Sequence, residues 1–354
     1  MSPKALKLGI LIDGPEISEL GVRGMTLKTE QINEQGGVWG RPVELVFETA
    51  DAAYDGLPDN TARAWRRLAA DTEVVGIIGP AITANTLAIV DLVDQEKVPT
   101  IHWGGTERAK GEWYFQYQLD SLSNDGPFLL RLLESHGHRR VGVLHTRSAE
   151  GEEIYEYFER EAQLTGIRTV AHETVAIHEE NVLEEMRRIK EQAPDAMVML
   201  GWHALPFLHA MKELEWRIPR YGTITCFRVT SEPELVADNE GLLYWADQYE
   251  PRNPTVIAIR EAYRLRFGED APDHIGVYCH YDLVTLMVEG LKRAPNISRS
   301  GLKVGLERVH QLPCATGGLR PVMGYSPGDR QAIKGPDLLM YRTIRDGRAV
   351  SYEP

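Results

Sequence analysis

The stretch VVGIIGPAITANTLAIVDLVDQEKVPTIHWGGT, residues 74–106, contains two short apolar segments separated by an amphipathic one. Val74–Ile78 and Val98–His102 are rich in β-branched residues, which predicts strands. Between them, apolar residues recur every three positions over 87–93, which predicts a helix with one apolar face. A strand, a helix and a second strand form a βαβ unit, whose two strands are parallel. This stretch therefore predicts an α/β fold.

The same alternation extends over most of the chain and then restarts near Asp120. The other predicted strands are Leu8–Ile12, Val43–Phe47, Val141–Leu144, Ile167–Val170, Met197–Leu200 and Tyr221–Thr225. The other predicted helices are Pro127–Ser135, Glu152–Leu164, Val182–Glu191, Ala204–Leu214, Pro254–Phe267 and Val277–Ala294. Strands at Leu338–Ile344 and Ala349–Tyr352, around the turn Asp346-Gly347, predict a closing hairpin. At 354 residues, two Rossmann-like parallel-sheet lobes are expected.

Composition and charge exclude several classes of protein. The formal net charge of −13 would repel a nucleic-acid backbone, so no nucleic-acid partner is expected. The longest uncharged apolar stretch, Val74–Val90, is interrupted by Gly79-Pro80, so we expect no insertion into a membrane. The start of the chain lacks the features of a signal peptide, which leaves two readings open: a cytoplasmic protein, or an exported one whose signal was removed.

The motifs of common enzymes and metal sites are missing from the sequence. The first strand is followed by IDGPEISELG, which lacks the G-x-G-x-x-G of dinucleotide-binding folds, and no phosphate loop, nucleophile elbow or H-E-x-x-H motif is found. Three scattered cysteines make neither a disulfide framework nor a metal site. His136 and His138 are expected to lie at a solvated helix end, and of the acidic run that follows, only Glu150 is a functional candidate. We therefore expect no catalytic residues, no cofactor and no metal.

Two polar loops follow adjacent predicted strands. Gly79–Thr86 combines a Gly-Pro turn with hydroxyl groups at a helix start, and His102–Thr106 contains two glycines and a hydroxyl. In parallel sheets, ligands bind at the carboxyl ends of strands, where backbone N–H groups are available. Together the loops fit a neutral site for a carboxylate. For either loop alone, a helix cap or a simple turn explains the same residues.

These segments resemble the type I periplasmic solute-binding proteins of ABC transporters, in the branched-chain amino-acid (leucine/isoleucine/valine-binding) group. The resemblance spans almost the whole chain and is strongest where EQINEQGGVWGRPVEL is followed by IIGP. Its other segments are LGILIDGP, RLAADTEVVGIIGP, VPTIHWGGT, VGVLHTRSAEG and YCHYDLVTLMVEGL. It implies two lobes joined by three crossovers that close on a small ligand without catalysis. The implied lobes are residues 1–119 with 249–325, and 120–248 with 326–354.

The resemblance also implies which residues bind the ligand. Thr83 and Thr106 match hydroxyl residues that hold the ligand carboxylate, and Gly104, next to Gly105, matches a carbonyl that receives an α-ammonium group. The second lobe departs from the family pattern at two places: Glu150 stands where a Tyr is usual, and Phe227 and Arg228 replace the acid expected after Thr225. Segments that face the cleft in the family carry Trp103, Trp202, His203 and Tyr278.

The sequence therefore predicts a protein that binds a small carboxylate-bearing solute in a cleft between the lobes. The expected solute is an amino acid or a related acid, aromatic acids included. The expected location is the periplasm, and the expected partner is the permease of an ABC transporter. The alternative is a cytoplasmic ligand sensor of the same fold.

Overall fold

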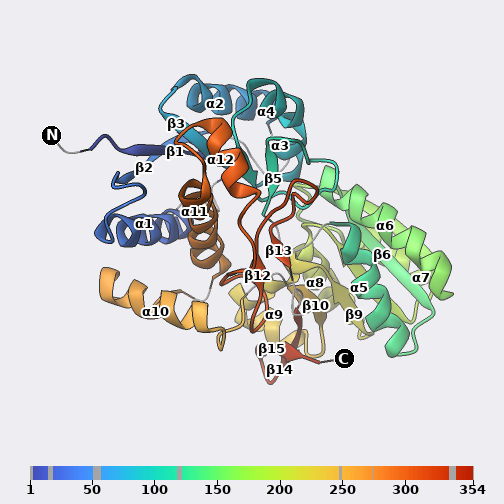
Figure 1. Cartoon of the computed structure of the whole chain (residues 1–354). Coiled ribbons are helices and arrows are strands. Elements are labelled where there is room, and N and C mark those ends of the chain that lie inside the picture. The colour runs from blue at the N-terminus through green and yellow to red at the C-terminus, as the bar shows by residue number, and fades with distance from the viewer. Residues whose placement is uncertain are drawn as a thin grey trace. The chain divides into compact units, whose positions relative to one another are not determined.

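The computed structural model describes residues 3–14, 19–50, 57–117, 122–246, 249–272, 274–334 and 340–353. The chain forms two compact units, which Figure 1 shows with their elements labelled. Unit 1 comprises Met1–Asp120 and Gln248–Leu338, and unit 2 comprises Ser121–Asp247 and Leu339–Pro354. The predicted crossovers near Leu119 and Gln248 lie outside the described residues. Within the described ranges, none of the helices is both long and apolar enough to span a bilayer.

Unit 1 is built on a parallel sheet of order β2-β1-β3-β4-β5. The strands are β1 (Leu6–Ile12), β2 (Val43–Thr49), β3 (Val74–Ile78), β4 (Thr100–His102) and β5 (Tyr114–Gln116). The helices are α1 (Glu19–Glu34), α2 (Pro58–Ala70), α3 (Thr83–Ala88), α4 (Val90–Glu96), α10 (Pro254–Phe267), α11 (Ile275–Arg293) and α12 (Arg299–Leu306). A small antiparallel sheet contains β11 (Leu312–Pro313), β12 (Val322–Met323) and β13 (Ile333–Lys334).

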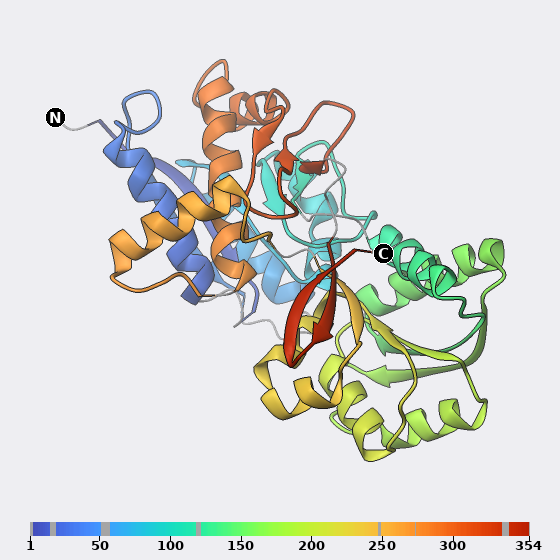
Figure 2. The same cartoon turned by 90° about the horizontal axis from the view of Figure 1, so that it is seen from below.

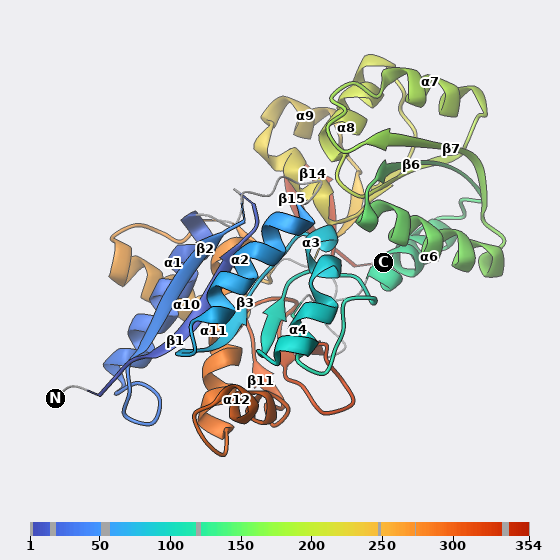
Figure 3. The ribbon, with the colours of Figure 1, turned by 90° about the horizontal axis from the view of Figure 1, so that it is seen from above.

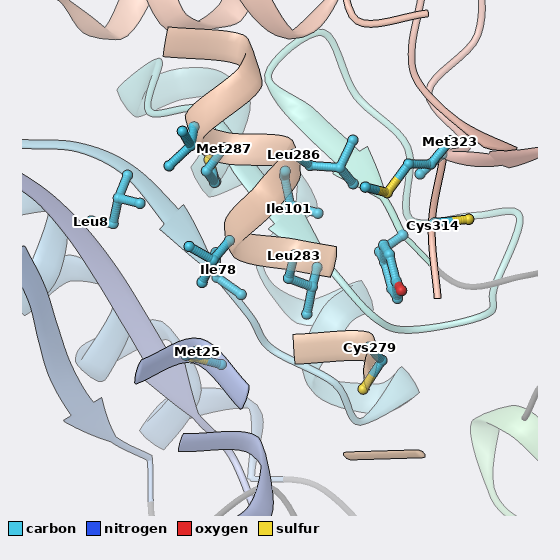
Figure 4. Close-up of a cluster of buried hydrophobic side chains, with 14 of the residues drawn as sticks. Leu8, Met25, Ile78, Ile101, Cys279, Leu283, Leu286, Met287, Cys314 and Met323 are labelled. Carbon is cyan, nitrogen blue, oxygen red and sulfur yellow. The ribbon is translucent and has the colours of Figure 1, made fainter. Parts of the chain in front are cut away.

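The alternation of side chains in β1 explains how helices cover both faces of this sheet. Leu8 and Ile10 pack into a core with residues of α1 and α11, part of which Figure 4 shows in close-up. Leu11 points to the other face and packs with α2 and α4. Gly9 lets α2 approach, since a Cβ there would lie 3.3 Å from Leu68 Cδ1. In Figure 3, α2 lies along the sheet.

Unit 2 is built on a sheet of order β15-β14-β10-β9-β8-β6-β7. The strands are β6 (Arg140–Arg147), β7 (Arg168–Ala176), β8 (Ala196–Leu200), β9 (Arg220–Gly222), β10 (Leu243–Ala246), β14 (Met340–Arg345) and β15 (Arg348–Tyr352). The helices are α5 (Leu122–Ser135), α6 (Ala149–Thr165), α7 (Leu183–Glu191), α8 (Ala204–Glu213), the 3₁₀ helix η2 (Ile224–Ser231) and α9 (Pro233–Asp238). One core contains α5 and α6, and the other contains α7, α8 and η2.

The final hairpin extends this sheet. β14 pairs with β10 and with β15, both antiparallel, as Figure 2 shows for the two red strands. Asp346 and Gly347 have φ angles of 52° and 67°, so both adopt the left-handed conformation that the hairpin turn requires. The hairpin predicted from Asp346-Gly347 is therefore confirmed.

The structure corrects several sequence predictions. The strand predicted at Tyr221–Thr225 ends at Gly222, and η2 begins at Ile224, where the Cys226 N–H donates to Thr223 O at 3.0 Å and closes a tight turn. The helix predicted after β3 divides at Ile89 into α3 and α4. Residues 326–334 were assigned to lobe two, but they belong to unit 1, where β13 pairs with β12. Glu150 lies in the first turn of α6 and not in the preceding loop.

Candidate functional site

The carboxyl ends of β1, β3 and β4 lie side by side in unit 1, because the three strands are parallel neighbours. The residues that follow them are Asp13, Gly79–Thr83 and Trp103–Thr106. The loops are tied together by backbone hydrogen bonds, in which Gly79 donates to Ile101 O at 2.8 Å and Trp103 donates to Pro80 O at 2.9 Å. The sheet therefore brings the two polar loops of the sequence analysis to one edge.

Asp13 fixes the loop that leads into α3. Its side chain is fully buried and accepts hydrogen bonds from Ala81 N at 2.9 Å, Ile82 N at 2.9 Å and Asn85 Nδ2 at 3.1 Å. Burial raises the pKa of the Asp13 carboxyl, and the three donors partly offset that rise. The Asp13 carboxylate thus accepts the backbone N–H groups just before α3, a role that the sequence analysis gave to a threonine hydroxyl as a helix cap. The sequence signal was an acidic residue directly after an apolar strand, and sequence reasoning missed it.

The two threonines of α3 differ in their hydrogen bonds. Thr86 Oγ1 donates to Ile82 O at 2.7 Å, so its hydroxyl is used within the helix. Thr83 stands at the first position of the helix and is 6% exposed, yet its hydroxyl has no partner among the described residues. A hydroxyl that makes no hydrogen bond within the described part of the protein is available to donate one to a ligand.

His102 organises the loop after β4. Its ring is fully buried, with Nε2 2.8 Å from Ala109 O and Nδ1 3.2 Å from Gly104 N. A carbonyl only accepts, so Nε2 carries the proton and Nδ1 accepts from the Gly104 N–H. Burial lowers the pKa of His102 to about 3, which keeps the ring neutral. His102 is a positioning residue that the sequence analysis treated only as the end of a strand.

Gly104 is placed where a larger residue would not fit. A Cβ on Gly104 would overlap Thr86 Oγ1, so the loop can approach α3 only with glycine. The Gly104 carbonyl accepts a hydrogen bond from Gln116 Nε2 at 3.0 Å, which uses one of its two lone pairs. Gly105 and Thr106 follow and are both buried, and Thr106 Oγ1 accepts from Arg108 N at 3.1 Å.

Of the aromatic candidates in unit 1, Trp103 lies beside the strand ends and Tyr278 does not. Trp103 is partly exposed, and its ring meets His280 edge to face at a centroid distance of 5.6 Å. Both rings line a small hollow with Pro80, Leu283 and neighbouring residues of β1 and β3. Tyr278 is fully buried in the core, where its hydroxyl accepts a hydrogen bond from Arg260 Nε at 2.9 Å.

In unit 2, Thr146 joins the ends of β6 and β8. Its Oγ1 accepts a hydrogen bond from Trp202 N at 2.8 Å and lies 3.0 Å from His203 Nδ1. Because the N–H of Trp202 donates to it, the Thr146 hydroxyl is free to donate its own proton to His203. Thr223 and Thr225 both donate to Gly201 O, so hydroxyls after β9 bind the same segment. These contacts fix Gly201–His203 in place.

His203 is used on both sides of its ring. Nδ1 faces Thr146, while the ring also makes hydrogen bonds to the backbone of Ala176 and Glu179. Burial lowers the pKa of His203, and those carbonyl contacts partly oppose the shift. His203, directly before α8, therefore positions the loop that follows β7.

The remaining candidates of unit 2 lie at different places on it. Trp202 is partly buried next to His203, and Glu150 is 9% exposed in the first turn of α6, where Ser148 caps the helix. Arg228 lies partly buried in η2. Phe227 precedes it in η2, and its side chain lies outside the described part of the structure.

The chain belongs to a family of periplasmic binding proteins, because the model of that family matches residues 14–339. Solved structures with the same fold cover nearly the whole chain. A substrate-binding protein of an ABC transporter from Desulfitobacterium hafniense is 20% identical, with a TM-score of 0.80 over 98% of this chain and 100% of that one. The branched-chain amino-acid transporter protein LivJ from Streptococcus pneumoniae, solved with isoleucine, is 19% identical, with a TM-score of 0.81 over 99% and 100%.

A leucine-binding protein LivK from Thermotoga maritima is 18% identical, with a TM-score of 0.80 over 99% of this chain and 98% of that chain. Among curated proteins, no significant match to the chain was found. The predicted α/β fold and the resemblance to solute-binding proteins are confirmed.

Proposed function

We propose that the protein binds a small carboxylate-bearing solute, an amino acid or a related acid, and delivers it to an ABC transporter. The observation that carries the proposal is the Thr83 hydroxyl, which has no partner among the described residues and lies at the strand ends beside Gly104–Thr106. A carboxylate accepts hydrogen bonds from hydroxyl and backbone N–H donors, and such charge-assisted bonds are strong.

The relatives support a solute of this kind. LivJ was solved with isoleucine, and an ABC transporter substrate-binding protein from Desulfitobacterium hafniense was solved in complex with leucine. We infer that Thr83 and Thr106 hold the solute carboxylate and that the partly exposed Trp103 covers the rest of the molecule. The family also supports a periplasmic location, with a permease as the membrane partner.

Unit 2 is proposed to complete the site with Trp202 and with the charged groups of Glu150 and Arg228. We infer that these two charges favour a polar or ring-bearing acid over a simple apolar amino acid. If the units close over such a solute, small-angle scattering should give a smaller radius of gyration at saturation while circular dichroism is unchanged. Identical scattering with and without the solute would contradict closure.

The test of the proposal starts with a thermal-shift screen of amino acids, aromatic acids and small amides. A solute at about 100 times its Kd adds about 2.7 kcal/mol of stability, which gives a clear shift. Thr83→Val, which keeps the shape of the side chain and removes the hydroxyl, should then weaken binding of that solute about ten- to a hundredfold.

Thr86→Val is the matched control one helical turn later, because that hydroxyl already donates to Ile82 O. We expect it to leave the affinity within about twofold of the unmodified protein. Unchanged affinity in Thr83→Val, measured by calorimetry, would refute the role of Thr83.

A further inference from the structure

A second polar hollow lies in unit 2, at the opposite end of the sheet from Thr146. It is formed by residues 217–220, which lead into β9, by Ala237 and Asp238 at the end of α9, and by Glu240 and Gly241 in the loop before β10. Its volume is about 460 Å³, and every residue that lines it belongs to unit 2. Arg220 is the first residue of β9, so the hollow lies at the amino-terminal edge of the strands. Figure 3 labels α8 and α9, the helices that precede these two loops in the chain.

Two guanidinium groups line this hollow. Arg220 is partly buried, and Arg217 is exposed and close enough to repel its charge. Neither forms an ion pair or a side-chain hydrogen bond with any residue that the structure describes. Burial together with the neighbouring Arg217 lowers the pKa of Arg220, which indicates that the charge of Arg220 is poorly compensated.

The acidic residues of the hollow are engaged elsewhere. Asp238 Oδ2 lies 2.7 Å from Lys212 Nζ, and this pair lowers the pKa of Asp238. Glu240 Oε1 accepts a hydrogen bond from Asp346 N at 3.2 Å. Asp238 still attracts Arg217 and Arg220 at longer range, but it forms no direct pair with either. Two arginines thus share one hollow with acids that already have partners.

A planar guanidinium offers several N–H donors in a fixed fork that matches a carboxylate or a phosphate. Two such groups held together repel each other, and Asp238, which also pairs with Lys212, offsets this repulsion at Arg220 only in part. We infer that the hollow is an anion site in which Arg217 and Arg220 bind a small oxyanion, either phosphate or the carboxylates of a small organic acid. The volume suffices for either, since small-molecule pockets begin at about 300 Å³.

The inference does not depend on the proposed solute site. That site lies at the carboxyl ends of the strands, whereas this hollow lies at the amino-terminal end of β9. An anion bound by Arg217 and Arg220 would stabilise the loop that connects α8 to β9. It would therefore raise the thermal stability of the protein even when no transported solute is present.

The experiment titrates the full chain with inorganic phosphate and, separately, with citrate. Both titrations use calorimetry at constant ionic strength, with chloride as the reference salt, because screening alone changes surface electrostatics. The expected result is saturable binding of at least one anion with a Kd of about 1 mM or tighter. The anion that binds more tightly shows whether the hollow prefers a phosphate group or carboxylate groups.

Arg220→Gln and Arg217→Gln should each weaken this binding at least tenfold. Arg160→Gln is the control, since Arg160 is an exposed arginine of the same unit on α6. Thr83→Val should leave the phosphate isotherm unchanged, which separates this hollow from the proposed solute site. The inference is overturned if neither anion binds the unmodified protein saturably, or if both arginine variants bind as tightly as Arg160→Gln.

Discussion

The carboxyl edge of the sheet in unit 1 differs from that of unit 2 in how its hydroxyl groups are used. In unit 1, the buried side chains Asp13 and His102 hold the loops from below, and the Thr83 hydroxyl has no partner among the described residues. In unit 2, the hydroxyls of Thr146 and Thr223 bond to the protein itself. Under the proposed function, unit 1 offers a hydroxyl to a carboxylate, whereas these hydroxyls of unit 2 stabilise the loops of their own unit.

The largest loss of stability is expected when Asp13, which holds the loop between β3 and α3, is replaced. Asp13→Ala would leave Ala81 N, Ile82 N and Asn85 without their acceptor, so unfolding should become easier by about 3 kcal/mol. Urea denaturation measures this change.

Asp91→Ala is the control for Asp13→Ala. Asp91 is an exposed carboxylate in the first turn of α4, so its loss should change stability by about 0.5 kcal/mol or less. If Asp13→Ala is no less stable than Asp91→Ala, Asp13 is not the support that its contacts indicate.

The second prediction concerns how the buried His280 ring makes the stability of the protein depend on pH. Burial lowers the pKa of His280 to about 4, below the ordinary value of 6.5, so unfolding takes up a proton between these values. The stability that His280 contributes is present above pH 6.5 and is lost as pH falls toward about 4, at about 1.4 kcal/mol per pH unit. His280→Gln should therefore remove about 2 kcal/mol of the difference in stability between pH 7 and pH 5.

Asp282 acts in the opposite sense. Burial raises its pKa to about 6, so it favours the folded state as pH falls toward its ordinary value of 3.8. This contribution is common to the unmodified protein and the variant, and it cancels in their comparison. Urea titrations at the two pH values measure the difference, with His280→Asn as a second variant. The same dependence on pH in all three proteins would contradict the prediction.

The smallest effect is expected at the edge of unit 2. Thr146→Val removes the acceptor of Trp202 N and the partner of His203, which should cost about 1–2 kcal/mol of stability. Thr174→Val is the control, because Thr174 is an exposed residue of the neighbouring strand β7, where valine is well tolerated. Equal stability of the two variants would show that the Thr146 contacts contribute little.

Hydrophobic periodicity predicted most of the fold because it repeats over whole elements. Val74–Ile78 and Pro254–Phe267 were predicted with the bounds that the structure gives them. β5 was missed, since three residues are too few to show a period. The first two residues of η2, Ile224 and Thr225, were predicted as strand because both are β-branched.

The candidate site was less predictable, because its chemistry depends on contacts between distant residues. Thr83 could be selected from its place after a strand, but the partners of His203 lie on β6 and near the end of β7, far away in sequence. Tyr278 was selected by resemblance, and only the structure shows its hydroxyl bonded to Arg260 in the core. Charge and spacing gave no signal for the pair of arginines at the other edge of unit 2.

The central claim, that the edge of unit 1 receives a carboxylate, is tested most directly by a pair of ligands. The acid with the largest thermal shift is compared, by calorimetry, with its carboxamide, which has the same shape and no negative charge. The account predicts that the amide binds at least about tenfold more weakly, because a hydrogen bond to a charged group contributes about 1.5–3 kcal/mol. Equal affinity for the acid and its amide would contradict it.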